Sequence, residues 1–83
     1  MVVAAARARA VRAVFDLVVA NLLADAIVAE ADDLARAVAP AGRLIVSGLL
    51  AAQSDRVARA FPGWRVVATL AEDDWKTLTL GRA

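Results

Sequence analysis

The sequence predicts an α/β domain with half of a doubly wound sheet, and three observations carry that prediction. Two short apolar runs, residues 15–20 and 43–50, have the composition of strands buried on both faces. A helix-like pattern follows each run, which is the order of parallel strand-helix units. Two runs rich in β-branched and aromatic residues, 64–70 and 75–80, flank an acidic turn, so they predict a closing antiparallel hairpin.

Residues 2–13, ahead of the first predicted strand, favour a helix. They are rich in alanine, the strongest helix former. Small apolar residues recur there at three- and four-residue spacing, and the arginines fall between them. We therefore divide the chain into an N-terminal alanine- and arginine-rich helix, residues 1–14, and an α/β domain, residues 15–83.

Two helices are predicted to connect the strands. The first extends from Leu22 to Ala39, and Pro40 and Gly42 stop it. Its apolar side chains share one stripe: Leu23, Ile27, Leu34 and Val38. Gly48 is expected to end the second strand, and residues 51–60 form the second helix. Val57 and Phe61 face the core, with Trp64 and Trp75 packing in the core or the hairpin.

The composition excludes several kinds of chemistry. Cysteine and histidine are both absent, which removes disulfides, thiolate catalysis and the commonest metal ligand. The formal net charge of +1 gives no strong attraction to nucleic acid or an anionic membrane. Charged residues interrupt every apolar run before the roughly 20 residues that a membrane-spanning helix needs. The N-terminal segment fits no targeting signal well, so a cytoplasmic location is expected.

The clusters of charged residues have ordinary explanations. Glu30, Asp32 and Asp33 occupy neighbouring helix positions that point in different directions, which favours a solvated face over a metal site. The acidic run at residues 72–74 is favoured as a polar turn. Ser47 has no histidine partner for nucleophilic catalysis. The N-terminal arginines lack interleaved aromatic residues, so direct nucleic-acid binding is not expected.

An asparagine stands where the first strand meets the following helix, in FDLVVANLLAD. Open α/β sheets bind ligands at the carboxyl ends of their strands, and Asn21 occupies that position. Asparagine is also a good helix N-cap, and from position alone capping is the simpler interpretation. Asp16 lies at the opposite end of the strand, where a structural role is favoured.

Three stretches in this order resemble the C-terminal half of class I S-adenosylmethionine-dependent methyltransferases: FDLVVANLLAD, PAGRLIVSGLL, and the hairpin with FPGWRVV and DWKTLTL. Within that group the chain is similar to the ribosomal protein L-eleven methyltransferases. The resemblance covers residues 15–82. It implies a partial Rossmann-like methyltransferase sheet, S-adenosylmethionine as cofactor, and a ribosomal protein as substrate.

The resemblance also implies a substrate-binding role for Asn21 and the Leu22 backbone. Related amino-methyltransferases carry Asn-Pro-Pro-Tyr or a variant here, whose amide oxygen and following carbonyl accept hydrogen bonds from the target amine. In this chain Leu22 and Leu23 replace the prolines and Ala24 replaces the aromatic residue. An aromatic wall beside the amine must therefore come from elsewhere or be absent. Positioning and desolvation suffice for this chemistry, so no catalytic residue is assigned.

The cofactor site of the family is expected to lie outside this chain. The family uses a glycine-rich turn after its first strand and an acidic residue that ends its second. No glycine precedes Gly42, and no acidic residue precedes Asp16. We therefore expect a part of a methyltransferase that is inactive alone and needs a complementary cofactor-binding chain. The alternative is a non-catalytic, self-associating remnant that serves as an interaction module.

Self-association is expected in either case. Both crossovers run in one direction, so their helices cover the same face of the sheet and leave the other face partly bare. Without the first half of the sheet, the edge of the strand at residues 15–20 is unpaired. Unpaired edges and apolar patches promote association, so we predict a homo-oligomer.

Overall fold

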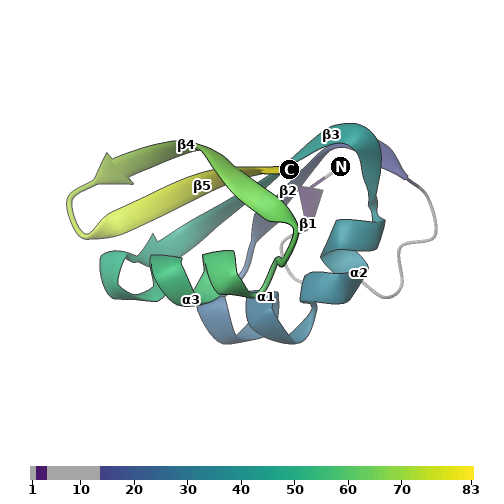
Figure 1. The fold of residues 1–83 in the computed structure, drawn as a ribbon. Coiled ribbons are helices and arrows are strands. Elements are labelled where there is room, and N and C mark those ends of the chain that lie inside the picture. Colours follow the sequence, from purple (N-terminus) through teal and green to yellow (C-terminus); the bar gives the residue numbers. More distant parts are fainter. Residues whose placement is uncertain (1, 4–13) are drawn as a thin grey trace.

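Five strands form one mixed sheet, in the order β1-β2-β3-β5-β4, in a computed structural model that describes residues 2–3 and 14–83. The strands are β1 (Val2–Val3), β2 (Phe15–Asn21), β3 (Val38–Leu50), β4 (Trp64–Glu72) and β5 (Trp75–Arg82). The helices are α1 (Ala24–Ala29), α2 (Ala31–Arg36), the short 3-10 helix η2 (Ala51–Gln53) and α3 (Ser54–Arg59). β5 is antiparallel to its neighbours β3 and β4, whereas β2 is parallel to β3 (Figure 1). The mixed α/β sheet with a closing hairpin is thereby confirmed.

The parallel pair β2 and β3 forms the centre of the sheet. Val18 lies opposite Leu44, and Ala20 lies opposite Val46. All four side chains are fully buried on the helical face. The two apolar runs were predicted to be buried strands because adjacent valines and leucines suit a covered sheet, and this is confirmed for the face that the helices cover.

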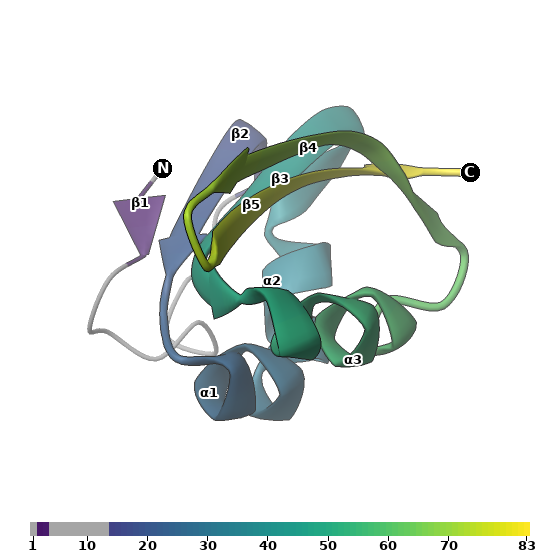
Figure 2. The same ribbon diagram turned by 90° about the vertical axis from the view of Figure 1, so that its left-hand side faces the viewer.

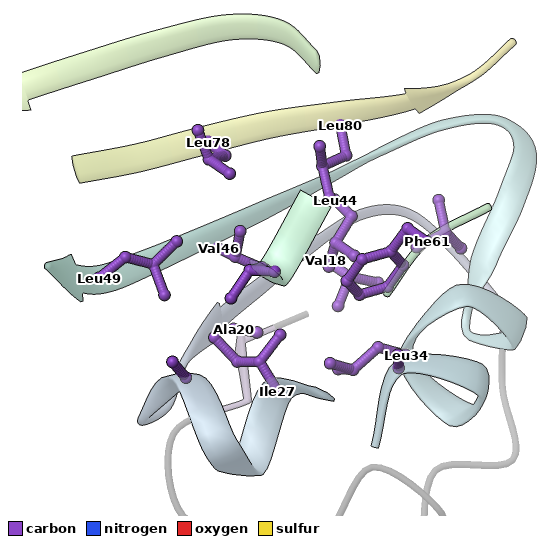
Figure 3. Packing of buried hydrophobic residues seen from close by; sticks show 14 of the residues in the cluster. Val18, Ala20, Ile27, Leu34, Leu44, Val46, Leu49, Phe61, Leu78 and Leu80 are labelled. Atoms are coloured by element: carbon purple, nitrogen blue, oxygen red, sulfur yellow. The ribbon is translucent and has the colours of Figure 1, made fainter. Parts of the chain in front are cut away.

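The three α-helices lie on one face of the sheet, as the direction of the crossovers predicts (Figure 2). Their buried side chains include Ile27, Leu34 and Val57, and Phe61 follows α3 into the same core. Figure 3 shows Ile27 and Leu34 reaching from the helices toward the strands. No helix in the described part of the chain is long and apolar enough to cross a membrane.

The single helix predicted over residues 22–39 is wrong, because the chain forms two short helices there. Glu30, with φ −108° and ψ 16°, interrupts the helical backbone between α1 and α2. Leu23 precedes α1 in an extended conformation and is 79% exposed, so it does not belong to the apolar stripe. Each helix instead buries its own pair of residues three positions apart: Ala24 with Ile27, and Ala31 with Leu34.

β3 begins earlier than predicted, at Val38 and ahead of Pro40. Phe15 pairs with Val38, and the Phe15 N–H donates to the Ala37 carbonyl over 2.8 Å, so the chain joins the sheet at once after α2. Gly42 lies where β3 crosses the start of β2. A Cβ atom there would stand 2.7 Å from the Asp16 carbonyl oxygen, so only glycine allows this approach.

The N-terminal prediction is wrong at Val2 and Val3, which form the short strand β1. They pair in parallel with Val19 and Ala20. The open edge of β2 offers backbone hydrogen-bonding groups that outweigh a local helix preference. The rest of the predicted helix, residues 4–13, lies outside the described residues, so the division of the chain stays a prediction.

The hairpin has the predicted turn, and its two tryptophans differ in environment. Asp73 has φ 54°, a left-handed conformation that aspartate tolerates in tight turns. Trp64 packs against the core, with its ring centroid 6.0 Å from that of Phe61. Trp75 is 54% exposed, so of the two expected environments, core and hairpin, the core is excluded for this residue. It lies beside the turn, at the outer end of the hairpin, opposite Leu50 at the end of β3.

Arg82 connects the last strand to the helical side of the fold. Its guanidinium donates one hydrogen bond to the Ala35 carbonyl and one to the Ala39 carbonyl, each 2.8 Å long. The same group lies 4.5 Å from the centroid of the Trp64 ring. One planar cation therefore satisfies two carbonyls near the end of α2 and covers an aromatic face.

We predict that Arg82→Ala lowers the free energy of unfolding by about 1–3 kcal/mol, because two carbonyls lose a charged donor and Trp64 loses its cation. The free energy of unfolding of Arg82→Lys should lie between those of the wild type and Arg82→Ala, since an ammonium group keeps the charge but lacks the planar fork. Urea unfolding followed by tryptophan fluorescence measures both changes. Arg59→Ala, an exposed arginine of α3, is the matched control. Equal losses in Arg82→Ala and the control would contradict the connecting role of Arg82.

Candidate functional site

Asn21 ends β2 at the carboxyl edge of the parallel pair, as predicted. It lies opposite Ser47 of β3, which is the last pair of the parallel ladder, so the carboxyl end of β2 meets β3 just before its bulge. The Asn21 side chain is exposed, and within the described residues it makes no hydrogen bond of its own. Its amide is therefore available to a ligand at the place where open α/β sheets bind them.

The capping interpretation of Asn21 is wrong. The N-cap of α1 is Leu23, two residues further along, and no side chain caps this helix. Asn21 belongs to the strand, and Leu22 and Leu23 separate it from the first helical residue, Ala24. An asparagine that satisfies no helix end and lies on the ligand-binding edge needs another explanation.

Gly48 carries no side chain that would crowd the Asn21 amide. It has φ +79°, and a Cβ atom at this position would stand 3.0 Å from the Asn21 Oδ1 atom and 3.9 Å from the Leu22 carbonyl oxygen. The prediction that Gly48 ends the strand is wrong. β3 bulges there and resumes, with Leu49 opposite Lys76 and Leu50 opposite Trp75, because glycine tolerates the positive φ.

The edge brings two neutral oxygen acceptors close to Gly48. Both the Asn21 Oδ1 atom and the Leu22 carbonyl lie within 4 Å of the place that a Gly48 side chain would occupy. Amide and backbone oxygens accept hydrogen bonds but carry no charge, so they suit an N–H donor such as an amine. Oxygen atoms of this kind are suited to orient an N–H donor, and Asn21, Leu22 and Gly48 include no side chain that transfers a proton at pH 7.

The other residues considered from the sequence lie away from this point. Asp16 is near the amino end of β2, at the far end of the strand from Asn21. Ala24 is buried in the core, so its methyl group forms no wall beside a ligand. Leu23, which is highly exposed and close to Asn21 in the chain, is the apolar residue next to the site. Sequence reasoning assigned neither Leu23 nor Gly48 to this site; the available signal was their position, two residues after Asn21 and directly after Ser47.

The acidic clusters of the described residues are not arranged as a metal site. No group of three or more carboxylates is placed in this part of the chain to hold an ion. Asp33 pairs instead with Arg36 over 2.5 Å on α2. Asp32 and Glu72 are both exposed to solvent.

We predict that Gly48→Ala destabilises the fold more than Gly63→Ala does. Both glycines have positive φ, which costs about 1–2 kcal/mol for alanine, but only the new Cβ at position 48 meets another atom closely. Adding Asn21→Ala to Gly48→Ala should remove the extra loss, and urea unfolding of the three variants measures it. Equal destabilisation of the two single variants would show that Gly48 and Asn21 are not in the contact described.

Comparison with known proteins places the chain in a family. A family model described as Ribosomal protein L11 methyltransferase (PrmA) matches residues 1–83. The ribosomal protein L11 methyltransferase of Rhizobium etli (strain CIAT 652) is 43% identical over 70 residues, which are 82% of this chain and 24% of that protein. The corresponding protein of Caulobacter sp. (strain K31) is 40% identical over 70 residues, with the same two shares.

Solved structures agree with these sequence relatives. The crystal structure of a ribosomal protein L11 methylase from Lactobacillus delbrueckii subsp. bulgaricus is similar with a TM-score of 0.80 and 26% identity, over 87% of this chain and 38% of that chain. TrmN from Thermus thermophilus, with a TM-score of 0.65 and 18% identity, covers 94% of this chain and 27% of its own, and shows the fold alone.

The chain spans about a quarter of the length of the curated relatives that it matches. Within that span, the order of strands, helices and hairpin agrees with a methyltransferase structure, and the sequence identity is about 40%. Because the family model also matches from the first residue to the last, this chain belongs to the ribosomal protein L11 methyltransferase family.

Proposed function

We propose that this chain forms the acceptor side of a methyl-transfer site on a partial Rossmann-like sheet. In this proposal, the Asn21 Oδ1 atom and the Leu22 carbonyl hold an amino group of a protein substrate. The observation that supports it most is the pair of neutral acceptors, the Asn21 Oδ1 atom and the Leu22 carbonyl, that lie close together beside Gly48. The relatives are named for ribosomal protein L11, which makes this protein the first substrate to test.

Two acceptors at this edge would orient the amine rather than activate it chemically. An amine attacks through its nitrogen lone pair, and hydrogen bonds from its N–H groups to two fixed oxygens determine where that lone pair points. Holding the nucleophile in one orientation is worth a large rate factor when the reacting atoms are aligned. The exposed side chain of Leu23 is suited to exclude water from the bound amine once a substrate covers it.

The residues described at this edge fit an amine better than they fit the cofactor of the family. S-adenosylmethionine, when bound, supplies an activated methyl group. Its ribose hydroxyls and amino-acid group call for acidic residues and close backbone approach, whereas the residues at this edge, Asn21, Leu22, Ser47 and Gly48, are all neutral. We therefore assign the cofactor-binding residues to a complementary polypeptide, and derive no step from cofactor contacts within this chain.

A complementary polypeptide has a surface to occupy. The sheet face away from the helices carries exposed apolar side chains, among them Leu17, Val67 and Leu70 at 46%, 45% and 65% exposure. Among the described residues, β1 pairs with the edge of β2 at Val19 and Ala20, so the expectation of an unpaired edge is wrong at these two positions. An apolar face of this kind favours the addition of further structure. The proposal places this assembly in the cytoplasm.

The same bare face favours a second candidate function. A chain that buries this face against other copies of itself needs no cofactor-binding partner, and would act as a non-catalytic interaction module. The two functions differ in what Asn21 does. In the first, its amide binds an amine that is methylated; in the second, it has no bearing on activity or assembly.

A complementation assay tests the proposal. This chain is mixed with the part of the Rhizobium etli relative that it does not match, and methyl transfer from labelled S-adenosylmethionine to ribosomal protein L11 is measured. We expect transfer by the mixture and none by either part alone. Asn21→Ala should lower turnover about tenfold or more, with the KM for S-adenosylmethionine little changed, because the loss is in orienting the acceptor.

Asp32→Ala, which removes an exposed carboxylate of α2, is the control and should leave turnover unchanged. Full activity of Asn21→Ala would contradict its role in binding the amine. If the two parts form a stable complex in sedimentation but transfer no methyl group, the result favours the interaction module instead.

A further inference from the structure

β4 forms one margin of the sheet and is exposed along nearly its whole length (Figure 1). Every residue from Arg65 to Glu72 is exposed, and Trp64 alone packs against the core. The outer edge of β4 pairs with no other strand in the part of the chain that the structure describes. Its apolar residues Val66, Val67 and Leu70 are between 44% and 65% exposed.

Apart from its bulge between Val66 and Ala68, this margin lacks the charges and prolines that protect many edge strands. Natural edge strands carry central charges or proline that prevent pairing with another chain. In β4 the only charged residues are Arg65 and Glu72, which have opposite signs and lie at the two ends. The six residues between them, Val66–Ala71, are all uncharged.

Arg65 and Glu72 project from the same face of the sheet. Arg65 lies opposite Gly81, and Glu72 lies opposite Trp75. Gly81 and Trp75 are six residues apart on a regular strand, so they share a face. Glu72 lies seven positions after Arg65, an odd interval that would put the two side chains on opposite faces of a regular strand. The irregularity between Val66 and Ala68 adds one residue and brings them to the same face.

The extra residue lies on that face too. A Cβ atom built on Gly81 would stand 3.2 Å from the Val67 Cγ2 atom and 2.9 Å from the Arg43 Nη1 atom. Arg43 is next to Leu44, whose side chain is buried under the helices, so Arg43 and its neighbours here belong to the face without helices. Arg65, Val67, Leu70 and Glu72 therefore line the open face along the margin.

We propose that β4 pairs with β4 of a second copy of this chain, antiparallel about a twofold axis at Thr69. In this register Arg65 of each copy faces Glu72 of the other, which gives two ion pairs. Leu70 faces the bulge at Val67 of the other copy on the open face. Because the bulge shifts the alternation once in each strand, every facing pair lies on the same side of the joined sheet.

The pairing is self-complementary, as a twofold interface must be. On the helical face Val66 of one copy lies beside Ala71 of the other, and the two Thr69 residues meet at the axis. Cross-strand apolar, threonine and opposite-charge pairs each favour strand pairing. The strand order separates β4 from β2 by two strands, so the dimer leaves the edge at Asn21 free. The inference therefore goes beyond methyl transfer and does not depend on it.

Charge exchange across the interface tests this register. Sedimentation velocity of the whole chain over a range of concentrations measures the dimer dissociation constant. In the Glu72→Arg dimer, an arginine faces an arginine at both charged pairs. In the Arg65→Glu dimer, a glutamate faces a glutamate at both. Each single variant should therefore weaken the dimer about tenfold or more. The double variant Arg65→Glu/Glu72→Arg should restore the dimer, because it exchanges the two charges of each pair.

Asp32→Arg, on α2 and away from the interface, changes the net charge by the same amount as Glu72→Arg and should leave the dissociation constant unchanged. Thermal unfolding by circular dichroism checks that each variant remains folded. A wild-type chain that stays monomeric at every concentration would overturn the proposal. A dimer that the single variants do not weaken, or that the double variant does not restore, would equally overturn it and would assign self-association to another surface.

Discussion

The parallel pairing of β2 with β3 is the constraint on which the rest of this structure depends. It buries Val18 and Ala20 against Leu44 and Val46, where the helices pack. The same register brings Asn21 to the end of one strand beside the bulge of the next. A shift of one residue would turn every side chain of a strand to the opposite face, and would separate the amide from Gly48. Core packing and the candidate site thus follow from a single alignment of two strands.

In the described residues the helices cover one face of the sheet, and this determines how the fold can interact. The three α-helices of this part of the chain pack on that face, and Arg82 anchors the last strand to it. The other face carries surfaces available for partners, as do the two margins of the described sheet, the short β1 beside β2 at one margin and β4 at the other. The candidate amine site lies near the first margin, and the proposed self-pairing uses the second. Assembly and substrate binding can therefore occur together.

Sequence patterns predicted the features that depend on local composition. Valine-rich runs predicted β2 and β3, and the acidic turn predicted the hairpin, since both signals lie within a few residues. Interactions between distant segments could not be predicted in this way. β1 forms because the edge of β2 is open, and Gly48 is a bulge because β3 must continue along β5. The position of Asn21 could be predicted because it ends its strand. Its approach to Gly48 could not, because that residue lies 27 positions further along the sequence.

The measurement that tests the central claim most directly is a calorimetric titration of the purified chain with S-adenosylmethionine. We assign the acceptor side of a methyl-transfer site to this chain and the cofactor side to another polypeptide. We therefore expect no detectable heat of binding at micromolar concentrations of cofactor. Binding in the micromolar range would contradict this assignment, because the chain or its dimer would then hold the cofactor with residues that we assign to an acceptor amine.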